Sequence, residues 1–264
     1  MSEKILIIGA GAAGLMAAGT ISGRGMDVAI LERNDKPARK VAITGKGRCN
    51  VTNNCKELSE LIANVPTNGR FLYSAFSNFM PQDTIDLIED MGVPLKCERG
   101  NRVFPCSDKA TDIVDALVHY GTDDGAQIIH GRAKELIIKD GVLKGVRTFD
   151  GEEIAADKVI IATGGKSYPL TGSTGDGYEL ARQAGHTIIE PKPSLVPLNA
   201  HEGFCTDLMG LSLRNVTMKV IDTKKKNKII YDDFGEMLFT HFGVSGPMVL
   251  SASSRTVSYT HLTL

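Results

Sequence analysis

The sequence predicts an α/β fold, with a first domain built on a parallel sheet and a second, mainly β domain inserted into it. An apolar strand pattern over residues 4–8 runs into a Gly-x-Gly-x-x-Gly turn and then into an Ala-rich helical segment, as in a βαβ unit. Strand and helix patterns alternate from there to about residue 190. Past a cluster of prolines only short strand patterns follow, which indicates a second domain.

The glycine-rich turn predicts a dinucleotide site. Gly9 permits the tight turn, Gly11 lets the backbone approach a pyrophosphate, and Gly14 lets the helix pack on the strand. Free N–H groups at the start of the helix attract the phosphates. A second strand over residues 27–31 ends in Glu32, whose carboxylate can accept hydrogen bonds from both hydroxyls of an adenosine ribose.

A long segment, residues 33–54, follows Glu32 and is rich in glycine, asparagine, threonine and cations. It offers many hydrogen-bond donors and little capacity to fold on itself, so we expect a loop that a ligand orders. An exposed basic loop is the alternative. The ligand is favoured because the segment begins directly after the ribose carboxylate, beside the phosphates and the second half of a dinucleotide.

Three helices are predicted in the middle of the first domain. Thr67 can cap a helix with an aromatic stripe over residues 71–79, Pro81 can begin a second helix, and Ser107 can cap a third. Apolar residues recur at helical spacing in all three. We therefore expect these stripes to form ordinary core.

A β-meander and a returning strand complete the first domain. Two Asp-Gly turns divide residues 136–154 into three short strands. The chain then returns through a buried strand over 158–161, which ends in Ala-Thr-Gly-Gly, and a Gly-rich loop over 167–178 leads into a helix. Ligands of parallel sheets lie at the carboxyl ends of the strands, so this second Gly-rich edge is expected to meet the same cofactor.

The prolines place the domain boundary. We assign residues 1–190 to the first domain, 191–254 to the start of the inserted β-rich domain, and 255–264 to a non-native tail. The run Lys224–Lys226 is interpreted as a solvated hairpin tip rather than a binding patch. The strands expected in the second domain cover residues 216–221, 228–231 and 236–240.

Composition favours a small-molecule enzyme. The 30 basic and 31 acidic residues among 264 give a net charge of −1, so charge alone predicts no nucleic-acid partner and no anionic membrane surface. The five cysteines form no Cys-x-x-Cys pair and no zinc spacing, which favours a reducing cytoplasm. The N-terminal apolar stretch carries too many glycines and nearby charges for a signal peptide or a membrane span.

The most specific motifs of the chain cover residues 45–53 (GKGRCNVTN), 102–105, 162–165, 172–177 and 238–247. With these motifs the chain resembles, over about residues 3–254, the BaiN/YhiN-type family of bacterial FAD-dependent oxidoreductases. The helix entry over 174–177 is also similar to the flavoprotein subunits of succinate dehydrogenase and fumarate reductase. The resemblance implies a Rossmann-like FAD-binding domain of the glutathione-reductase and fumarate-reductase type.

The resemblance also implies roles for individual residues. The Gly9 turn would hold the FAD pyrophosphate, Glu32 the adenosine ribose, and Ala133 the adenine through its backbone, with residues 162–164 completing the adenine-side wall. No metal ligand is predicted. The cofactor-binding residues implied are Gly9, Gly11, Ala12, Gly14, Glu32, Arg33, Lys40, Thr44, Gly45, Arg48, Cys49, Asn50, Thr52, Ala133, Ala162, Thr163 and Gly164.

The function expected from this resemblance is flavin-mediated hydride transfer from NAD(P)H to an organic substrate such as a cyclic enone or a steroid-like compound. Arg102, Tyr168 and His241 are candidate proton donors or substrate anchors, and no catalytic residue is assigned. Two alternatives stay open. One is a catalytically defective nucleotide-binding fragment, because family members continue into a closing segment that this sequence lacks. The other is an NAD-binding dehydrogenase domain, which would have no use for the donor-rich segment after Glu32.

Overall fold

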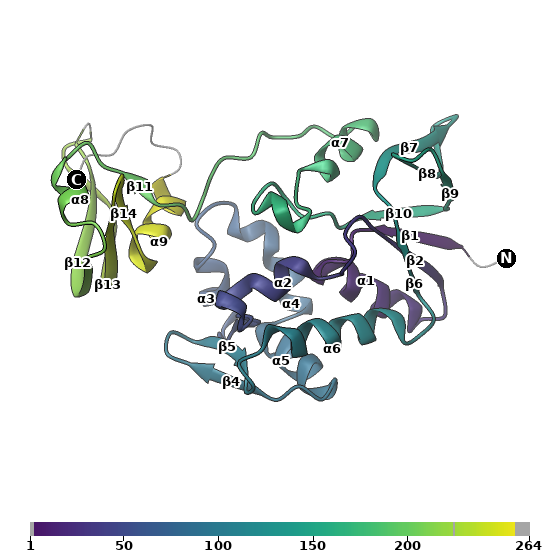
Figure 1. Cartoon of the computed structure of the whole chain (residues 1–264), viewed down its shortest axis with the longest axis horizontal. Coiled ribbons are helices and arrows are strands. Elements are labelled where there is room, and N and C mark those ends of the chain that lie inside the picture. Colours follow the sequence, from purple (N-terminus) through teal and green to yellow (C-terminus); the bar gives the residue numbers. More distant parts are fainter. Residues whose placement is uncertain (1–2, 224, 257–264) are drawn as a thin grey trace. The chain divides into compact units, whose positions relative to one another are not determined.

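The computed structural model describes residues 3–223 and 225–256. Its chain divides into two compact units, the first formed by Met1–Asn64 and Arg70–Ile188 and the second by Val65–Gly69 and Ile189–Leu264 (Figure 1). This division falls close to the boundary predicted at residue 190. Insertion of the second unit into the first stays a prediction, and the expected tail lies outside the described residues from 257 onward.

A parallel sheet forms the centre of the first unit and confirms the predicted α/β class. Its strand order is β10-β1-β2-β6. Apolar β-branched residues make these strands nearly continuous hydrophobic runs, as expected for a sheet covered on both faces. The strands are β1 (Lys4–Ile8), β2 (Asp27–Glu32), β6 (Gln127–His130) and β10 (Lys158–Ile161).

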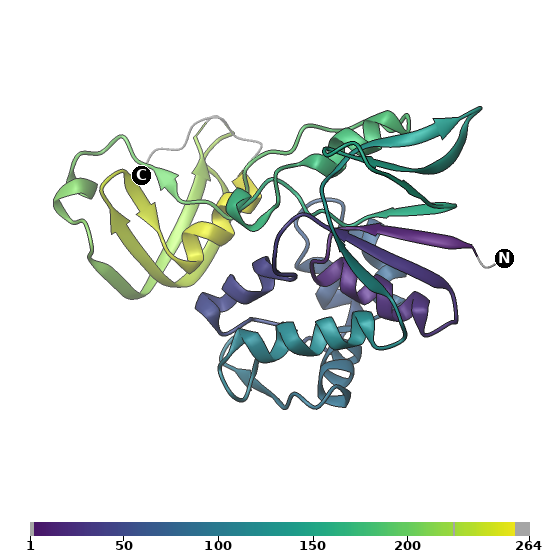
Figure 2. The ribbon, with the colours of Figure 1, turned by 45° about the vertical axis from the view of Figure 1, so that its right-hand side comes forward.

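Helices cover one face of this sheet. Ile5 and Ile7 of β1 point toward them and join a buried cluster with Leu15 and Ile113. Helices α1 and α6 lie side by side in both ribbon views (Figures 1 and 2), and Gly19 and Gly121 stand where they touch. The helices of this layer are α1 (Ala12–Ser22), α5 (Pro81–Asp90) and α6 (Ala110–Thr122).

The predicted β-meander covers the other face. Leu6 and Ile8, the alternate residues of β1, pack with Leu31, Val146 and Leu180 in a second buried cluster. The two faces of β1 therefore belong to two different cores, as the period of two in a strand requires. The elements of this layer are β7 (Ala133–Lys139), β8 (Val142–Thr148), β9 (Glu153–Ala155) and α7 (Asp176–Gln183).

The segment after Glu32 is more structured than the sequence suggested. It forms α2 (Arg39–Ile43), a 3-10 helix (Thr44–Gly47) and β3 (Thr52–Asn53). The expectation of a plain loop was wrong because contacts distant in sequence hold the segment. Ala38 donates its N–H to the carbonyl of Ala10 at 2.8 Å, and Val51 donates to the carbonyl of Val103 at 2.8 Å.

Two of the three predicted helices differ from expectation. Residues predicted to follow a Thr67 cap form a 3-10 turn (Gly69–Leu72) and the short α4 (Tyr73–Asn78), after α3 (Leu58–Ala63). Phe71 is 86% exposed, so the aromatic stripe is not all core. Helix α6 begins at Ala110 rather than beside Ser107, whose hydroxyl accepts the N–H of Lys109.

A small antiparallel sheet of order β3-β5-β4 lies below α2 in the first unit. Strand β5 (Arg102–Pro105) pairs with β3 on one side and with β4 (Leu95–Glu98) on the other. The motif over residues 102–105 forms β5, whereas β4 was not predicted, although its residues Leu95–Glu98 alternate between apolar and polar. This sheet fixes the end of the segment that starts at α2.

The second unit is an antiparallel sheet of order β11-β14-β13-β12 with two helices. Two strands predicted in its second half are one continuous strand, because β13 stays paired with β12 across Asp232–Gly235. Burial raises the pKa of Tyr231 to about 12, and its hydroxyl donates to Asp233. Lys224 of the predicted hairpin tip lies outside the described residues. The elements are β11 (Leu198–Asn199), α8 (Phe204–Asp207), β12 (Ser212–Asp222), β13 (Lys228–Thr240), β14 (Gly243–Ser245) and α9 (Pro247–Thr256).

Candidate functional site

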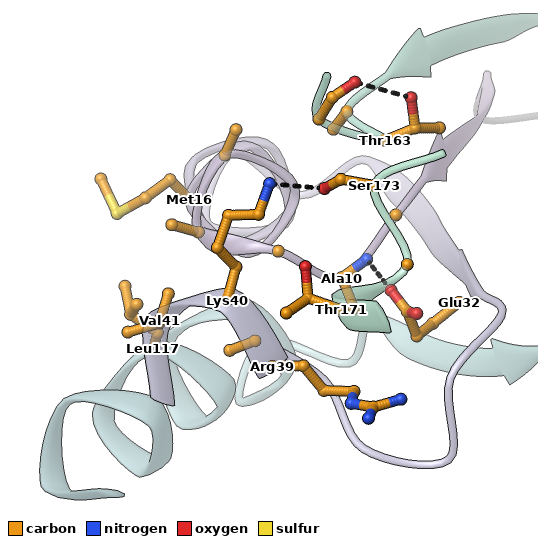
Figure 3. Close-up of a pocket in the computed structure, with 18 of the residues that line it drawn as sticks. Ala10, Met16, Glu32, Arg39, Lys40, Val41, Leu117, Thr163, Thr171 and Ser173 are labelled. Atoms are coloured by element: carbon orange, nitrogen blue, oxygen red, sulfur yellow. Dashed lines mark hydrogen bonds between the residues drawn. The ribbon is translucent and has the colours of Figure 1, made fainter. Parts of the chain in front are cut away.

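The four parallel strands end beside one another at one edge of the sheet. Ile8 pairs in register with Leu31 and with Ile161, and Glu32 pairs with His130. A cavity of about 840 Å³ opens at this edge (Figure 3). Its volume lies in the range of about 300–1,000 Å³ found for small-molecule sites. The residues that line it belong to the first unit.

The three glycines of the turn have three different surroundings. Gly9 has a φ of +106°, and a Cβ there would lie 2.7 Å from the carbonyl oxygen of Ala162. A Cβ at Gly14 would lie 1.8 Å from the carbonyl oxygen of Gly9. Gly11 borders the cavity and has no atom within 4 Å of a Cβ position. Gly9 and Gly14 therefore serve packing, whereas Gly11 leaves room for a ligand.

The N-terminus of α1 is open to this cavity. Gly11 caps the helix without a side-chain hydrogen bond, and its first turn holds no acidic residue. The first N–H groups of an α-helix lack intrahelical partners, and the helix dipole gives them a partial positive charge. Ala12 and Ala13 line the cavity at this point. The arrangement suits an anionic group such as a pyrophosphate.

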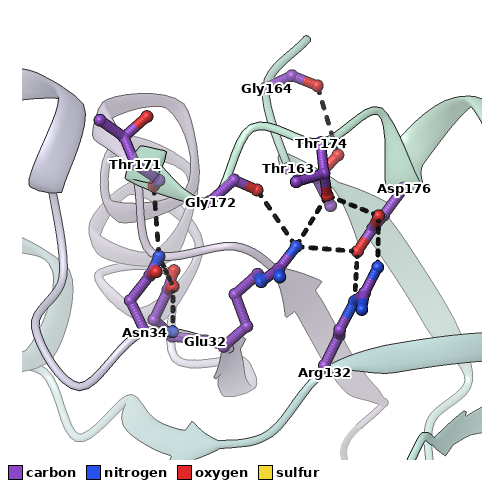
Figure 4. A network of polar contacts seen from close by, with 10 residues as sticks. Glu32, Asn34, Arg132, Thr163, Gly164, Thr171, Gly172, Thr174 and Asp176 are labelled. Atoms are coloured by element: carbon purple, nitrogen blue, oxygen red, sulfur yellow. Dashed lines mark hydrogen bonds and ion pairs between the residues drawn. The ribbon is translucent and has the colours of Figure 1, made fainter. Parts of the chain in front are cut away.

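Glu32 is buried at the end of β2 with its carboxylate fixed by the chain itself. Ala10 donates its N–H to Oε2 at 2.6 Å, and Asn34 donates its N–H at 2.8 Å and its side-chain amide at 2.6 Å to Oε1 (Figures 3 and 4). A carboxylate offers roughly four acceptor positions. Three of these positions accept N–H groups of the chain, so about one remains for a ribose hydroxyl. The sequence analysis had expected Glu32 to accept hydrogen bonds from both ribose hydroxyls.

Lys40 brings a cation to the wall of the cavity. It is half-buried on α2, and its Nζ donates to Ser173 Oγ at 2.7 Å and to the carbonyl of Ser167 at 2.9 Å (Figure 3). These contacts link α2 to the Gly-rich loop that follows β10. Thr171 and Ser173 of that loop also line the cavity.

A charged network stands at the other side of the loop. Arg132 makes a bidentate pair with Asp176 through Nε at 2.8 Å and Nη2 at 3.0 Å, and Arg33 reaches the same carboxylate at 3.3 Å (Figure 4). Thr174 donates its hydroxyl to Asp176 at 2.7 Å. The bond from Arg132 is the main reason that the pKa of Asp176 is lowered. Asp176 thus joins α7 to the ends of β2 and β6.

Replacement of Asp176 by asparagine is expected to lower the free energy of unfolding by about 2 kcal/mol, because hydrogen bonds to charged groups contribute about 1.5–3 kcal/mol. The lowered pKa fixes the sign of the pH dependence. The contribution of the carboxylate is present above its unfolded pKa of about 3.9 and is lost as the pH falls through the lower folded pKa. The difference between wild type and D176N should therefore shrink below about pH 4.

Urea denaturation followed by circular dichroism between pH 3 and pH 7 measures this difference. Asp150→Asn, at an exposed turn after β8, serves as the matched control and should change stability little at any pH. A D176N deficit that stays constant over the whole range would contradict the assignment.

The turn after α2 presents Thr44, Cys49 and Asn50 to the cavity. Cys49 is buried with a φ of +60°, and its N–H donates to the carbonyl of Thr44 at 3.0 Å. Burial raises the pKa of the Cys49 thiol, so the residue is a protonated, apolar wall group at neutral pH. No second cysteine forms a disulfide with it in the described part of the chain.

Arg48 points away from the cavity. Its guanidinium pairs with Glu98 of β4 and with Asp108, and it stacks 4.3 Å from the centroid of the Phe104 ring. These bonds raise the pKa of Arg48 and lower the pKa of Glu98. The pKa of Asp108 is lowered first by its hydrogen bond from Lys96 and then by the one from Arg48. Arg48 therefore fastens the turn to the small sheet.

The structure brings most of the sequence-predicted residues to one cavity. Gly14, Gly45, Arg48 and Thr52 are not on its wall, since Gly14 packs, Arg48 is ion-paired and Thr52 lies in β3. The predicted residues on the wall are Gly9, Gly11, Ala12, Glu32, Arg33, Lys40, Thr44, Cys49, Asn50, Ala133, Ala162, Thr163 and Gly164.

The three candidate proton donors or anchors are not on the wall either. Arg102 lies on β5 and donates to the carbonyl of Arg99. Tyr168 is 69% exposed on the loop after β10. His241 belongs to the second unit, where its ring meets Phe242 edge to face.

Several wall residues were missed by sequence reasoning. The opposite charges of Arg132 and Asp176, each beside a predicted motif, could have suggested their pairing. Asn34, Arg39 and Val41 lie in the segment 33–54 and Thr171 and Ser173 in the Gly-rich loop 167–178, two segments that were expected to meet the cofactor although these residues were not singled out. Met16 lies in the helix after the glycine turn, and Phe79, Leu87 and Leu117 lie in helices that were interpreted as core. The missed residues include Met16, Asn34, Arg39, Val41, Phe79, Leu87, Leu117, Arg132, Thr171, Ser173 and Asp176.

The donor set fits FAD. An open helix N-terminus and Lys40 suit the pyrophosphate, the buried carboxylate of Glu32 suits a ribose, and the unfilled space beside Gly11 leaves room for the cofactor backbone. Within the described residues, no group of three His, Cys, Asp or Glu side chains is placed to hold a metal ion. Every helix of that part of the chain also falls short of the length and apolar character needed to cross a bilayer.

Comparison with known proteins agrees with this geometry. A family model described as the HI0933-like protein Rossmann domain matches residues 3–252. The chain is 32% identical over 249 residues to a protein of Escherichia coli named ribosomal RNA dihydrouridine synthase, covering 94% of this chain and 60% of the relative. It is 31% identical over 256 residues to a 3-dehydro-bile acid delta(4,6)-reductase of Clostridium scindens, covering 95% and 60%. The chain thus spans about three fifths of the length of these relatives.

Solved structures show the same fold at lower identity. The open conformation of a flavocytochrome c3 fumarate reductase matches with a TM-score of 0.57 and 17% identity, over 83% of this chain and 48% of the other. The Sdh1 complex of Mycobacterium smegmatis matches with a TM-score of 0.51 and 19% identity, over 83% and 41%. These similarities support the Rossmann-like, FAD-binding type of fold.

Proposed function

Because the chain belongs to the HI0933-like Rossmann family, we propose that its first unit binds FAD and that the protein is a flavin-dependent oxidoreductase acting on a C=C bond conjugated with a carbonyl group. The cofactor assignment rests mainly on two neighbouring features that border the same cavity: the N-terminus of α1, which no side chain caps, and the buried carboxylate of Glu32. A pyrophosphate and a ribose on one ligand match these two features.

FAD, when bound, supplies hydride transfer to and from the substrate. The residues of the chain supply binding and orientation. The N–H groups at the start of α1 and the Lys40 ammonium would hold the pyrophosphate, and Glu32 would accept a ribose hydroxyl. The buried Cys49 and its apolar neighbours would exclude water, with Thr44 and Asn50 as the nearest polar side chains of that turn.

The reaction class rests on what the names of the relatives share. Formation of dihydrouridine and reduction at a delta(4,6) position of a 3-keto steroid acid both add two hydrogens to a C=C bond conjugated with a carbonyl. Within this reaction class, we propose a cyclic enone or a steroid-like compound as the substrate of this chain. NAD(P)H is proposed as the source of the hydride.

A uridine in RNA is the second candidate substrate. Two relatives, at 32% and 33% identity, are named ribosomal RNA dihydrouridine synthase. The composition of the chain argues less for RNA, since its net charge is −1 and most of its affinity for RNA would have to come from phosphate contacts. The sequence analysis predicted no nucleic-acid partner, but the names of these relatives are a reason to test RNA binding directly.

The first experiment is the visible absorption spectrum of the purified chain, with the released chromophore identified by mass. Bound FAD is the expected result. A chain that stays colourless and does not bind added FAD would contradict the proposal, and one that binds only NAD would favour the dehydrogenase alternative.

Replacement of Gly11 by valine is expected to weaken FAD binding at least 100-fold. A Cβ at Gly11 meets no protein atom within 4 Å, and its φ of −79° is open to any residue, so the variant should fold normally. The added side chain would occupy the space for the pyrophosphate. Titration of FAD fluorescence measures the affinity, and the absence of tryptophan from the sequence removes interference from that residue. Unchanged affinity would show that FAD does not cross Gly11.

A further inference from the structure

Asn34 is a half-buried residue of the cavity wall, and its side chain has hydrogen-bond partners on three sides. Its amide nitrogen donates to Glu32 Oε1 at 2.6 Å and to the carbonyl of Thr171 at 3.3 Å (Figure 4). Its amide oxygen accepts from Arg39 at 3.2 Å. An amide side chain has two N–H donors. Both are therefore in use, one toward the carboxylate of Glu32 and the other toward the Gly-rich loop.

The two oxygens of the Glu32 carboxylate have unequal surroundings. Oε1 accepts two N–H groups, both from Asn34, through the backbone at 2.8 Å and through the side chain at 2.6 Å. Oε2 accepts the N–H of Ala10 at 2.6 Å. Each carboxylate oxygen has about two acceptor positions, so Oε1 is filled by the described residues and the open position belongs to Oε2. That oxygen lies beside the glycine turn.

Asn34 keeps the carboxylate from turning. The last torsion of a glutamate side chain is broad and nearly two-fold, so an unclamped carboxylate could present either oxygen, or both, to the cavity. The Gly-rich loop closes the other side of Asn34, since a Cβ at Gly172 would lie 2.6 Å from Asn34 Nδ2. The amide therefore has little room to move away from Glu32.

We propose that Asn34 is a positioning residue, which clamps Oε1 of Glu32 so that Oε2 alone faces the ligand and a single ribose hydroxyl is recognised. This inference rests on the proposed function, because it concerns how the adenosine ribose of FAD is bound. The consequence is selectivity. Of the two deoxy forms of an adenosine ligand, only the form that lacks the recognised hydroxyl should bind more weakly.

The test uses the full chain and ADP, which carries the adenosine and the pyrophosphate of FAD, as the probe. Isothermal titration calorimetry compares ADP with 2′-deoxy-ADP and 3′-deoxy-ADP. In the wild type, one deoxy form should bind at least about tenfold more weakly than ADP, because a hydrogen bond to a charged acceptor contributes this much, and the other should stay within about threefold.

Asn34→Ala should remove this selectivity, because the freed carboxylate can accept from both hydroxyls. The two deoxy forms should then bind within about threefold of each other. A loss of folded protein lowers the affinity for all three ligands alike, so their ratio reports positioning rather than stability. Asn64→Ala is the matched control and should keep the selectivity, because Asn64 is exposed, donates to the carbonyl of Glu60 and is not a wall residue.

Asn34→Asp provides the test if N34A does not fold. It keeps the shape of the side chain, and at pH 8 it places a second carboxylate against Oε1, which repels that of Glu32 and should also remove the selectivity. Equal weakening of both deoxy forms in the wild type, or of neither, would overturn the inference, as would undiminished selectivity in a folded N34A or N34D chain. A chain that binds neither ADP nor FAD would overturn the proposed function together with this inference, whereas binding without selectivity overturns the inference alone.

Discussion

Gly14→Ala is expected to destabilise the first unit by more than about 3 kcal/mol, at the upper end of what overpacking costs. The added Cβ would lie 1.8 Å from the carbonyl oxygen of Gly9, and backbone cannot give way as a flexible side chain can. Gly9 is itself fixed, since its N–H donates to the carbonyl of Leu31 at 2.8 Å. A cost of this size is a large part of the 5–15 kcal/mol that typically holds a domain together.

Urea denaturation followed by circular dichroism would measure this loss. Gly11→Ala is the matched control three residues earlier, and it should change stability by less than about 0.5 kcal/mol because its Cβ meets open space. Equal stability of the two variants would contradict the packing role assigned to Gly14.

Glu32→Ala is expected to lower both stability and FAD affinity. The carboxylate accepts the N–H groups of Ala10 and Asn34, and an unsatisfied buried donor costs about 1–3 kcal/mol. With two such donors we expect a loss of about 2–6 kcal/mol. FAD affinity should fall at least tenfold, because the ribose acceptor is removed and the end of β2 loses its fixed shape.

Glu179→Gln on α7 is the control for this variant. Glu179 pairs with Arg182 on an exposed helix surface, where ion pairs contribute about 0–1 kcal/mol. Denaturation and FAD titration should leave this control close to wild type. Wild-type FAD affinity in a folded E32A chain would refute the assignment of Glu32 to the ribose.

The predicted and observed structures agree best where interactions between residues close in the sequence determine the structure. The strand over 4–8, the glycine turn and Glu32 could be predicted because periodicity and backbone freedom act within a few residues. The meander was readable from its Asp-Gly turns, and Gly141 and Gly151 have positive φ angles of 74° and 91°. The dinucleotide site proposed at this edge of the sheet rests on these same features.

The predicted and observed structures disagree where contacts between residues far apart in the sequence determine the local structure. The segment after Glu32 folds as helix and strand because Ala10 and Val103 accept its N–H groups. Phe71 was read as core from its spacing alone, yet no neighbour covers it among the described residues. Arg48 was assigned to the cofactor, but carboxylates of Glu98 and Asp108, 50 and 60 residues away, hold it at the small sheet.

The sequence by itself determined the α/β class, the glycine turn after β1 and the acidic residue at the end of β2, because each depends on neighbours in the chain. Tertiary structure alone decided that Lys40 meets Ser173 and that Arg132 meets Asp176. It also decided that Met16, Val41 and Leu117, from three different helices, line the same cavity. The physical reason is that these groups lie tens of residues apart and are brought together only when the strands pair and the helices pack on them.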